Sequence, residues 1–213
     1  SNPAIFEKAI GQGAAYAGEI AALVRQGRSG KAIYEALAIT DIQAAADALR
    51  PVFDRSRAAD GYASLEVSPA LARDTEGTLA EARRLWAAVD RPNLMIKVPG
   101  TAEGVPAIRQ LIAEGINVNV TLLFSQAAYR AVAEAYLAGL EERHARSQPV
   151  QGIASVASFF VSRIDTAVDA LIEQRAHAAA DVAAALALRG RTAIANARLA
   201  YRHYQALCGT ARW

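Results

Sequence analysis

Residues 94–101 read Leu-Met-Ile-Lys-Val-Pro-Gly-Thr, and this stretch decides the predicted fold. Residues 94–98 form an apolar run interrupted only by Lys97, which predicts a strand, and the Pro-Gly pair that follows predicts a turn. A segment with helical periodicity comes next, at residues 102–114. A strand, a turn and a helix in this order form the repeating unit of a parallel sheet.

The same unit recurs on both sides of this stretch. Four strands are predicted, at residues 63–67, 94–98, 116–120 and 153–157. Each is apolar on both faces, as expected for strands that are covered on both sides. Helices are predicted between them at residues 74–89, 102–114 and 125–143, with Asp74 and Ser125 as N-caps of the first and last. This alternation predicts an α/β fold with a parallel sheet, either a barrel or a doubly wound sheet.

The two ends of the chain carry a different pattern. Residues 4–53 and 161–207 are Ala-rich and helical without a convincing strand, and residues 147–152 are predicted to form a loop. A barrel needs about eight strands to close around its side chains, so four cannot close it. Either further strands are missing from this sequence or the sheet is open. No repeat or linker divides the chain, which predicts a single domain over residues 1–213.

Composition excludes several classes of protein. With 23 Lys and Arg against 21 Asp and Glu, the charge is too balanced for a protein that binds chiefly nucleic acid or an anionic membrane. The single cysteine, Cys208, can form no internal disulfide and has no zinc-site spacing around it. No secretion signal and no apolar run of about 20 residues is present, so we expect a cytoplasmic protein. Composition leaves the oligomeric state open.

Lys97 is the first candidate catalytic residue, because it lies late in an apolar strand and just before a turn. At the carboxyl end of a barrel strand it would face the region where such folds build their sites. Partial burial favours the neutral amine, which can attack a carbonyl and form an imine. Alternatively, Lys97 extends its amine to solvent from the strand end, or binds a phosphate as a point charge.

Glu66 is the second candidate, in a similar position near the end of the strand at residues 63–67. A buried carboxylate is costly unless it is paired. Beside an imine-forming lysine, Glu66 could move protons as a carbinolamine becomes an imine. The alternative is a structural ion pair with Lys97.

Two further groups of polar residues are associated with the third and fourth predicted strands, the first lying in and just beyond its strand and the second directly after its strand. Asn117, Asn119 and Thr121 share one face at period two, which suits recognition of sugar hydroxyls and orientation of a water, or simply polar packing. Residues 158–163 contain Ser158, Phe160 and Arg163, and the arginine could bind a phosphate through its fork of donors. The alternative for Arg163 is a surface ion pair with a nearby aspartate, Asp165 or Asp169.

The three histidines lie in helical, charge-rich surroundings and match no catalytic or metal-binding spacing. We expect surface or packing roles for His144, His177 and His203.

Taken together and in this order, these segments resemble the transaldolase family, whose fold is a (β/α)8 TIM barrel. The resemblance runs through nearly the whole chain, and its opening residues 1–6 resemble the segment after the family's second strand. It implies catalytic roles for Lys97 as the imine-forming lysine, Glu66 as the acid and base, and Thr121 as the residue that orients a water. It implies substrate contacts for Asn2, Asn119, Ser158, Phe160 and Arg163.

The resemblance also implies which parts of a barrel this sequence holds. The four predicted strands would be the third to the sixth, and the first and last strands would be missing. A first strand with a catalytic aspartate would lie before Ser1, and two further strands would follow Trp213.

The implied activity is transfer of a dihydroxyacetone unit from a ketose phosphate, fructose 6-phosphate or sedoheptulose 7-phosphate, to an aldose phosphate in the pentose phosphate pathway. The family needs no cofactor and no metal, because the protonated imine accepts the electrons. Two alternatives stay open. One is a simple class I aldolase that releases the three-carbon unit, and the other is a non-catalytic fragment that binds sugar phosphates.

Overall fold

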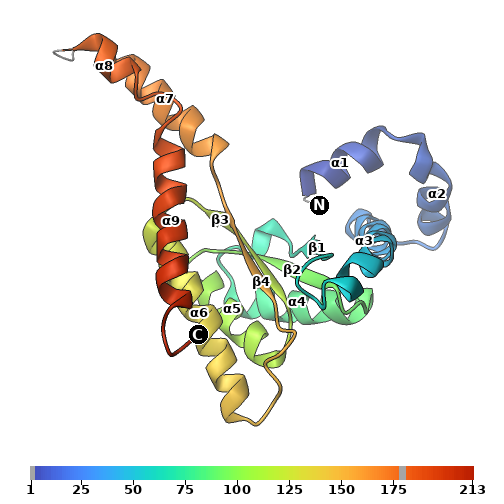
Figure 1. The fold of residues 1–213 in the computed structure, drawn as a ribbon. Coiled ribbons are helices and arrows are strands. Elements are labelled where there is room, and N and C mark those ends of the chain that lie inside the picture. Colours follow the sequence, from blue (N-terminus) through green and yellow to red (C-terminus); the bar gives the residue numbers. More distant parts are fainter. Residues whose placement is uncertain (1–2, 178–180) are drawn as a thin grey trace.

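A single parallel sheet forms the centre of the chain in the computed structural model, which describes residues 3–177 and 181–213. Its strands lie side by side in chain order (Figure 1): β1 (Ala63–Glu66), β2 (Leu94–Pro99), β3 (Val118–Leu123) and β4 (Ser155–Phe159). The four predicted strands are therefore confirmed. The third and fourth begin two residues later than predicted.

Three helices follow the first three strands and cover one face of the sheet (Figure 1): α4 (Thr75–Val89), α5 (Gly104–Glu114) and α6 (Gln126–Ala145). The predicted caps are confirmed. The Asp74 side chain accepts a hydrogen bond from the Gly77 amide at the start of α4, and the Ser125 side chain accepts one from the Ala128 amide at the start of α6. Strand, helix and parallel strand thus alternate as the sequence predicts.

The ends of the chain are helical, as predicted. The helices before the sheet are α1 (Pro3–Gln12), α2 (Ala17–Arg25) and α3 (Gly30–Arg55), with short 3-10 turns η1 (Ala14–Tyr16) and, after β1, η2 (Pro69–Leu71). Those after it are α7 (Ser162–Ala176), α8 (Val182–Leu186) and α9 (Thr192–Cys208). In Figure 1, α9 lies beside α6, whereas α7 and α8 extend away from the sheet. The predicted loop at residues 147–152 is free of helix and strand.

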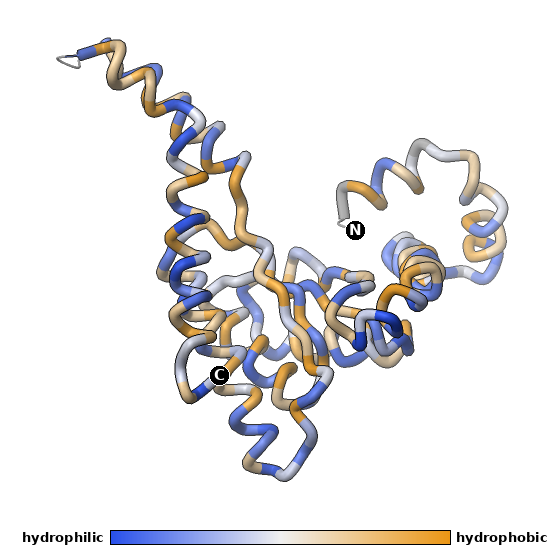
Figure 2. Tube along the Cα trace, viewed as in Figure 1, coloured by the Kyte–Doolittle hydropathy of each residue, from blue (hydrophilic) through white to orange (hydrophobic). Residues whose placement is uncertain are grey.

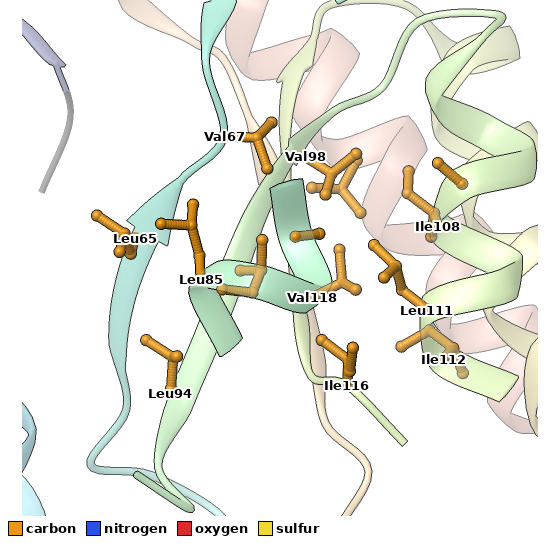
Figure 3. Packing of buried hydrophobic residues seen from close by; sticks show 14 of the residues in the cluster. Leu65, Val67, Leu85, Leu94, Val98, Ile108, Leu111, Ile112, Ile116 and Val118 are labelled. Carbon is orange, nitrogen blue, oxygen red and sulfur yellow. The ribbon is translucent and has the colours of Figure 1, made fainter. Parts of the chain in front are cut away.

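The two faces of the sheet differ in polarity, and here the prediction of strands apolar on both faces is wrong. The outer face packs against α4 and α5 through one cluster of buried aliphatic side chains (Figure 3), which includes Leu65, Val67, Leu85, Leu94, Val98, Ile108, Leu111, Ile112, Ile116 and Val118. The helices alternate between hydrophobic and hydrophilic residues along their length (Figure 2), as helices with one buried side do. The inner face carries the polar residues of the strands, described below.

Hydrogen bonds that skip a strand show that the sheet is strongly curved. Asn119 Nδ2 on β3 donates to Ser64 Oγ on β1 at 3.2 Å, although β2 lies between them. Next-but-one strands of a flat sheet lie about 10 Å apart with parallel side chains, which is too far for these short groups to meet. The inner face is therefore concave. Contact between alternate strands is how barrels fill their interior.

Asn117 and Leu122 shape the two ends of β3. The buried Asn117 side chain donates to the Leu94 carbonyl at 3.0 Å and accepts from the Ala154 amide at 2.8 Å, so it fastens β3 to both neighbouring strands. Of the two roles considered for Asn117, polar packing is therefore the one observed. At the other end, Leu122 has a φ of +60° and the pairing with β4 shifts register between Val120 and Leu123. This bulge lets Thr121 face inward while Leu123 packs in the core.

Candidate active site

The carboxyl ends of β1 and β2 bring Lys97 and Glu66 together. The two residues are register partners on adjacent parallel strands, and Lys97 Nζ lies 3.4 Å from Glu66 Oε2. Their side chains are 13% and 18% exposed, so both charges sit in a largely enclosed place that is still open to a ligand. Alternation along each strand turns both side chains away from the apolar core and onto the concave face.

Thr121 completes this group from β3. Its hydroxyl donates to Glu66 Oε1 at 3.4 Å, and the residue is only 4% exposed. One carboxylate therefore contacts the lysine amine through one oxygen and the threonine hydroxyl through the other. An amine, a carboxylate and a hydroxyl in this arrangement can form an imine and move the protons that the reaction requires. The ion pair with Lys97 considered as an alternative role for Glu66 is also present. It is formed by the same amine and carboxylate that imine chemistry would use.

Asn119 lies beside this group, because it is the register partner of Lys97 on β3. Its amide is held at both ends, with Nδ2 donating to Ser64 Oγ at 3.2 Å and Oδ1 accepting from Ser158 Oγ at 2.8 Å. These two bonds hold the amide between β1 and β4. The second bond places Ser158 of β4 beside Asn119.

Phe160 and Arg163 follow β4 and lie against each other. The Arg163 guanidinium carbon is 4.7 Å from the centre of the Phe160 ring, a cation–π contact. The aspartates proposed as alternative partners are engaged elsewhere. Asp165 accepts a hydrogen bond from the Ala193 amide, and Asp169 accepts one from the Gly190 amide. Among the described residues, Arg163 forms no ion pair with a carboxylate, so the surface ion pair is wrong.

Comparison with known proteins identifies the family of this chain. The family model described as Transaldolase/Fructose-6-phosphate aldolase matches residues 1–211. The chain belongs to this family. A protein named Transaldolase from Thermobifida fusca (strain YX) is 53% identical over 213 residues, and one of the same name from Trichodesmium erythraeum (strain IMS101) is 50% identical over 216 residues. Transaldolase 2 of Nostoc punctiforme (strain ATCC 29133 / PCC 73102) is 52% identical over 217 residues.

Each of these three matches covers 100% of the chain but only 56% to 57% of the relative. The chain thus spans a little over half the length of the transaldolases that it resembles. Within that span, one concave face brings together five of the predicted site residues: Glu66, Lys97, Asn119, Thr121 and Ser158. Asn2, the remaining substrate-binding prediction, lies outside the described residues.

A cavity of about 190 Å³ adjoins the site between α3, α4 and the end of β1, and its lining includes Tyr34, Glu66, Ser68 and Glu81. Burial first, and the nearby negative charge of Glu66 second, raise the pKa of the Tyr34 hydroxyl. Tyr34 therefore stays neutral at physiological pH. The buried Glu81 carboxylate accepts the Ser68 amide at 2.5 Å and so fixes the turn that follows Glu66.

Other residues considered from the sequence lie away from this face. His144 and His177 are exposed, and His203 packs edge-to-face on Tyr129, as expected. Within residues 3–177 and 181–213, no group of three or more His, Cys, Asp or Glu side chains is placed to hold a metal ion. Nor does that part of the chain contain a helix with the length and apolarity that crossing a membrane requires.

Two residues of the site escaped the sequence analysis. Ser64 holds the Asn119 amide, and its signal is its position two residues before Glu66, which places both on the same face of β1. Phe124 stacks on Phe160 with ring centres 4.9 Å apart. Each of these phenylalanines directly follows the last residue of its strand, a pattern visible only once the strand ends are known.

Proposed function

We propose that this chain carries the Schiff-base site of a transaldolase, within a (β/α)8 barrel of which β1 to β4 are consecutive strands. The observation that carries the proposal is the Lys97 amine 3.4 Å from the Glu66 carboxylate, with Thr121 on the other carboxylate oxygen. The curvature of the sheet and the contacts between alternate strands support the barrel. Single-domain organisation over residues 1–213 and a cytoplasmic location remain part of this proposal.

The reaction starts with imine formation. The neutral Lys97 amine attacks the C2 ketone of a ketose phosphate, and a proton passes from the new ammonium nitrogen to the carbonyl oxygen to give a neutral carbinolamine. Glu66 then protonates the departing hydroxyl, directly or through a water held by Thr121, and water leaves as the imine forms. Glu66 is placed to take the proton that the Lys97 amine loses before it attacks, because Glu66 Oε2 lies 3.4 Å from Lys97 Nζ.

Cleavage of the C3–C4 bond follows on this imine. The C4 hydroxyl loses a proton, an aldose phosphate departs, and the electron pair of the broken bond moves to the imine, which becomes an enamine. The resemblance assigns the C4 proton to an aspartate of the barrel's first strand. The enamine then attacks the carbonyl of an acceptor aldose phosphate, and hydrolysis of the new imine releases the product ketose and regenerates Lys97.

Sugar phosphates are the proposed substrates, consistent with a place in the pentose phosphate pathway. Asn119 and Ser158 offer hydrogen bonds to sugar hydroxyls beside Lys97, and Asn2 is proposed to join them. Phe160 and Arg163 follow the carboxyl end of β4 and contact each other, and the guanidinium fork of Arg163 suits a phosphate. No step needs a metal or a cofactor.

Trapping the imine tests the proposal. The sequence holds three lysines, Lys8, Lys31 and Lys97, so the site of an adduct can be assigned without ambiguity. The protein is incubated with fructose 6-phosphate, reduced with borohydride and weighed by intact mass spectrometry. We expect one reduced adduct, present in the Lys31→Arg variant and absent from the Lys97→Arg variant, with circular dichroism showing that all samples are folded. A folded protein without an adduct that still gains thermal stability from the sugar phosphate would instead be a binding module.

Simple aldol cleavage is the second candidate, because the family model covers transaldolases and fructose-6-phosphate aldolases together. The two activities differ in the fate of the three-carbon unit. Erythrose 4-phosphate added to fructose 6-phosphate should yield sedoheptulose 7-phosphate if the chain is a transaldolase. Release of free dihydroxyacetone at the same rate with and without this acceptor would favour the aldolase.

A further inference from the structure

Three side chains form a stack at the carboxyl ends of β3 and β4. The rings of Phe124 and Phe160 lie nearly parallel, with an interplanar angle of 19° and centres 4.9 Å apart. The Arg163 guanidinium lies over the Phe160 ring at 4.7 Å. Phe124 is 39% exposed, so its position is not explained by burial in the core.

Hydrogen bonds hold both phenylalanines of the stack in place. The Phe160 amide donates to the Leu123 carbonyl at 2.8 Å, directly beside Phe124 in the chain. The Phe124 carbonyl accepts from Asn196 Nδ2 of α9 at 2.8 Å, and Gln126 Nε2 in turn donates to Asn196 Oδ1 at 2.7 Å. The stack is thus connected to β3, β4 and α9, which makes Phe124 a fixed support rather than a loose surface ring.

The local structure around Arg163 does not favour a positive charge. It is exposed and lies in the first turn of α7, where the helix dipole disfavours positive charge. Neither nearby aspartate pairs with it. Asp169 accepts a hydrogen bond from the Gly190 amide, and Asp165 accepts one from the Ala193 amide at the start of α9. An aromatic face holds the guanidinium without using its N–H donors, so those donors remain available to an anion.

We propose that Phe124 is a positioning residue that determines the preference for phosphorylated substrates. It acts through Phe160, whose ring it holds in the orientation that supports Arg163, and Arg163 binds the phosphate. This inference rests on the proposed function, which assigns Arg163 to that phosphate. In this proposal Phe124 makes no contact with the substrate.

The test compares Phe124→Leu with Phe124→Tyr, which keeps the ring. For Phe124→Leu we expect the KM for erythrose 4-phosphate to rise about fivefold, the scale of one aromatic pair, with kcat unchanged. The KM for unphosphorylated erythrose should not change. Phe124→Tyr should behave as the unmodified protein does. Val150→Ala, an apolar surface residue of similar exposure in the loop before β4, serves as the matched control.

Direct binding of inorganic phosphate separates this inference from the proposed function. Calorimetric titration should give a Kd about fivefold weaker for Phe124→Leu than for Phe124→Tyr, whether or not the protein forms an imine. An adduct at Lys97 together with equal phosphate binding by both variants would overturn the inference and leave the proposed function standing. Equal loss of phosphorylated and unphosphorylated substrates would also overturn it, because only a general distortion of the site does that.

Discussion

At the scale of single residues, the site depends on the Glu66 carboxylate, which contacts two neighbouring side chains. Glu66 contacts Lys97 through Oε2 and Thr121 through Oε1, both at 3.4 Å. The amine must be neutral to attack a ketone, yet the departing hydroxyl must receive a proton. A carboxylate within reach of both groups can take the first proton and supply the second.

Glu66→Gln tests this double role. The amide is of similar size and keeps a polar contact with Thr121, but it cannot accept and return a proton. We expect the rate of adduct formation with fructose 6-phosphate to fall about 100-fold, within the range for general acid–base catalysis. Single-turnover trapping with borohydride measures this rate.

Glu35→Gln provides the matched control, because Glu35 is also a partly buried carboxylate in an ion pair, with Arg84, and its side chain is 25% exposed. Its rate should remain that of the unmodified protein. If Glu66→Gln formed the adduct as fast as this control, Glu66 would be only a structural partner of Lys97.

At the scale of elements, the bulge at the end of β3 is what turns Thr121 toward Glu66. Strict alternation would place Leu123 on the same inward face as Thr121, but the register shift lets Leu123 pack fully buried on the outer face. Leu122 takes the left-handed conformation that the shift needs, and it is 38% exposed. A leucine with this backbone conformation is strained by about 1–2 kcal/mol.

Leu122→Asn should therefore stabilise the protein. Asparagine tolerates a positive φ, and little buried apolar surface is lost at this exposed position. We expect the free energy of unfolding to rise by about 0.5–1 kcal/mol in urea denaturation. Leu122→Ala removes the same exposed surface but keeps the strain, so it should bring no gain. Equal stability of the two variants would show that the backbone of Leu122 is not strained.

The bulge also marks the limit of what the sequence could predict. Lys97 and Glu66 could be found because charged residues stand out in apolar strands, and their positions near strand ends place them together. The predicted start of β3 is two residues too early, because residues 116 and 117 continue the alternation of apolar and polar residues seen in the strand. In the structure, the Asn117 side chain instead bonds to the backbone on both sides of β3. The contacts of Ser64 and Phe124 depend on the curvature of the sheet and on the side-chain geometry, which a linear pattern does not contain.

At the scale of the whole molecule, ion pairs join the four helices from α3 to α6 in succession. α3 is linked to α4, α4 to α5 and α5 to α6, through Arg84–Glu35, Arg83–Glu114 and Arg109–Glu142. These pairs lie outside the apolar cluster that holds the helices on the sheet. Partly exposed pairs contribute little individually, but they fix how neighbouring helices are placed around the curved sheet.

The pair between Arg83 and Glu114 makes this contribution measurable through pH. Two hydrogen bonds from the Arg83 guanidinium, at 2.6 and 2.8 Å, lower the pKa of the Glu114 carboxyl below its usual value of 4.5. Because the pKa is lower in the folded state, the pair stabilises the fold above the pKa of the unfolded chain. This contribution is lost as the pH falls through the folded pKa.

Arg83→Gln should accordingly lower the free energy of unfolding by at most about 1 kcal/mol near neutral pH. The difference from the unmodified protein should shrink as the pH falls below the usual carboxyl pKa and disappear once Glu114 is protonated in the fold. Urea denaturation across an acid pH series measures both curves. Arg130→Gln, which removes an exposed arginine of α6 that forms no ion pair among the described residues, should show no such pH dependence. A stability difference for Arg83→Gln that stays constant across the series would mean that Arg83 stabilises the helices by packing rather than through the charge of Glu114.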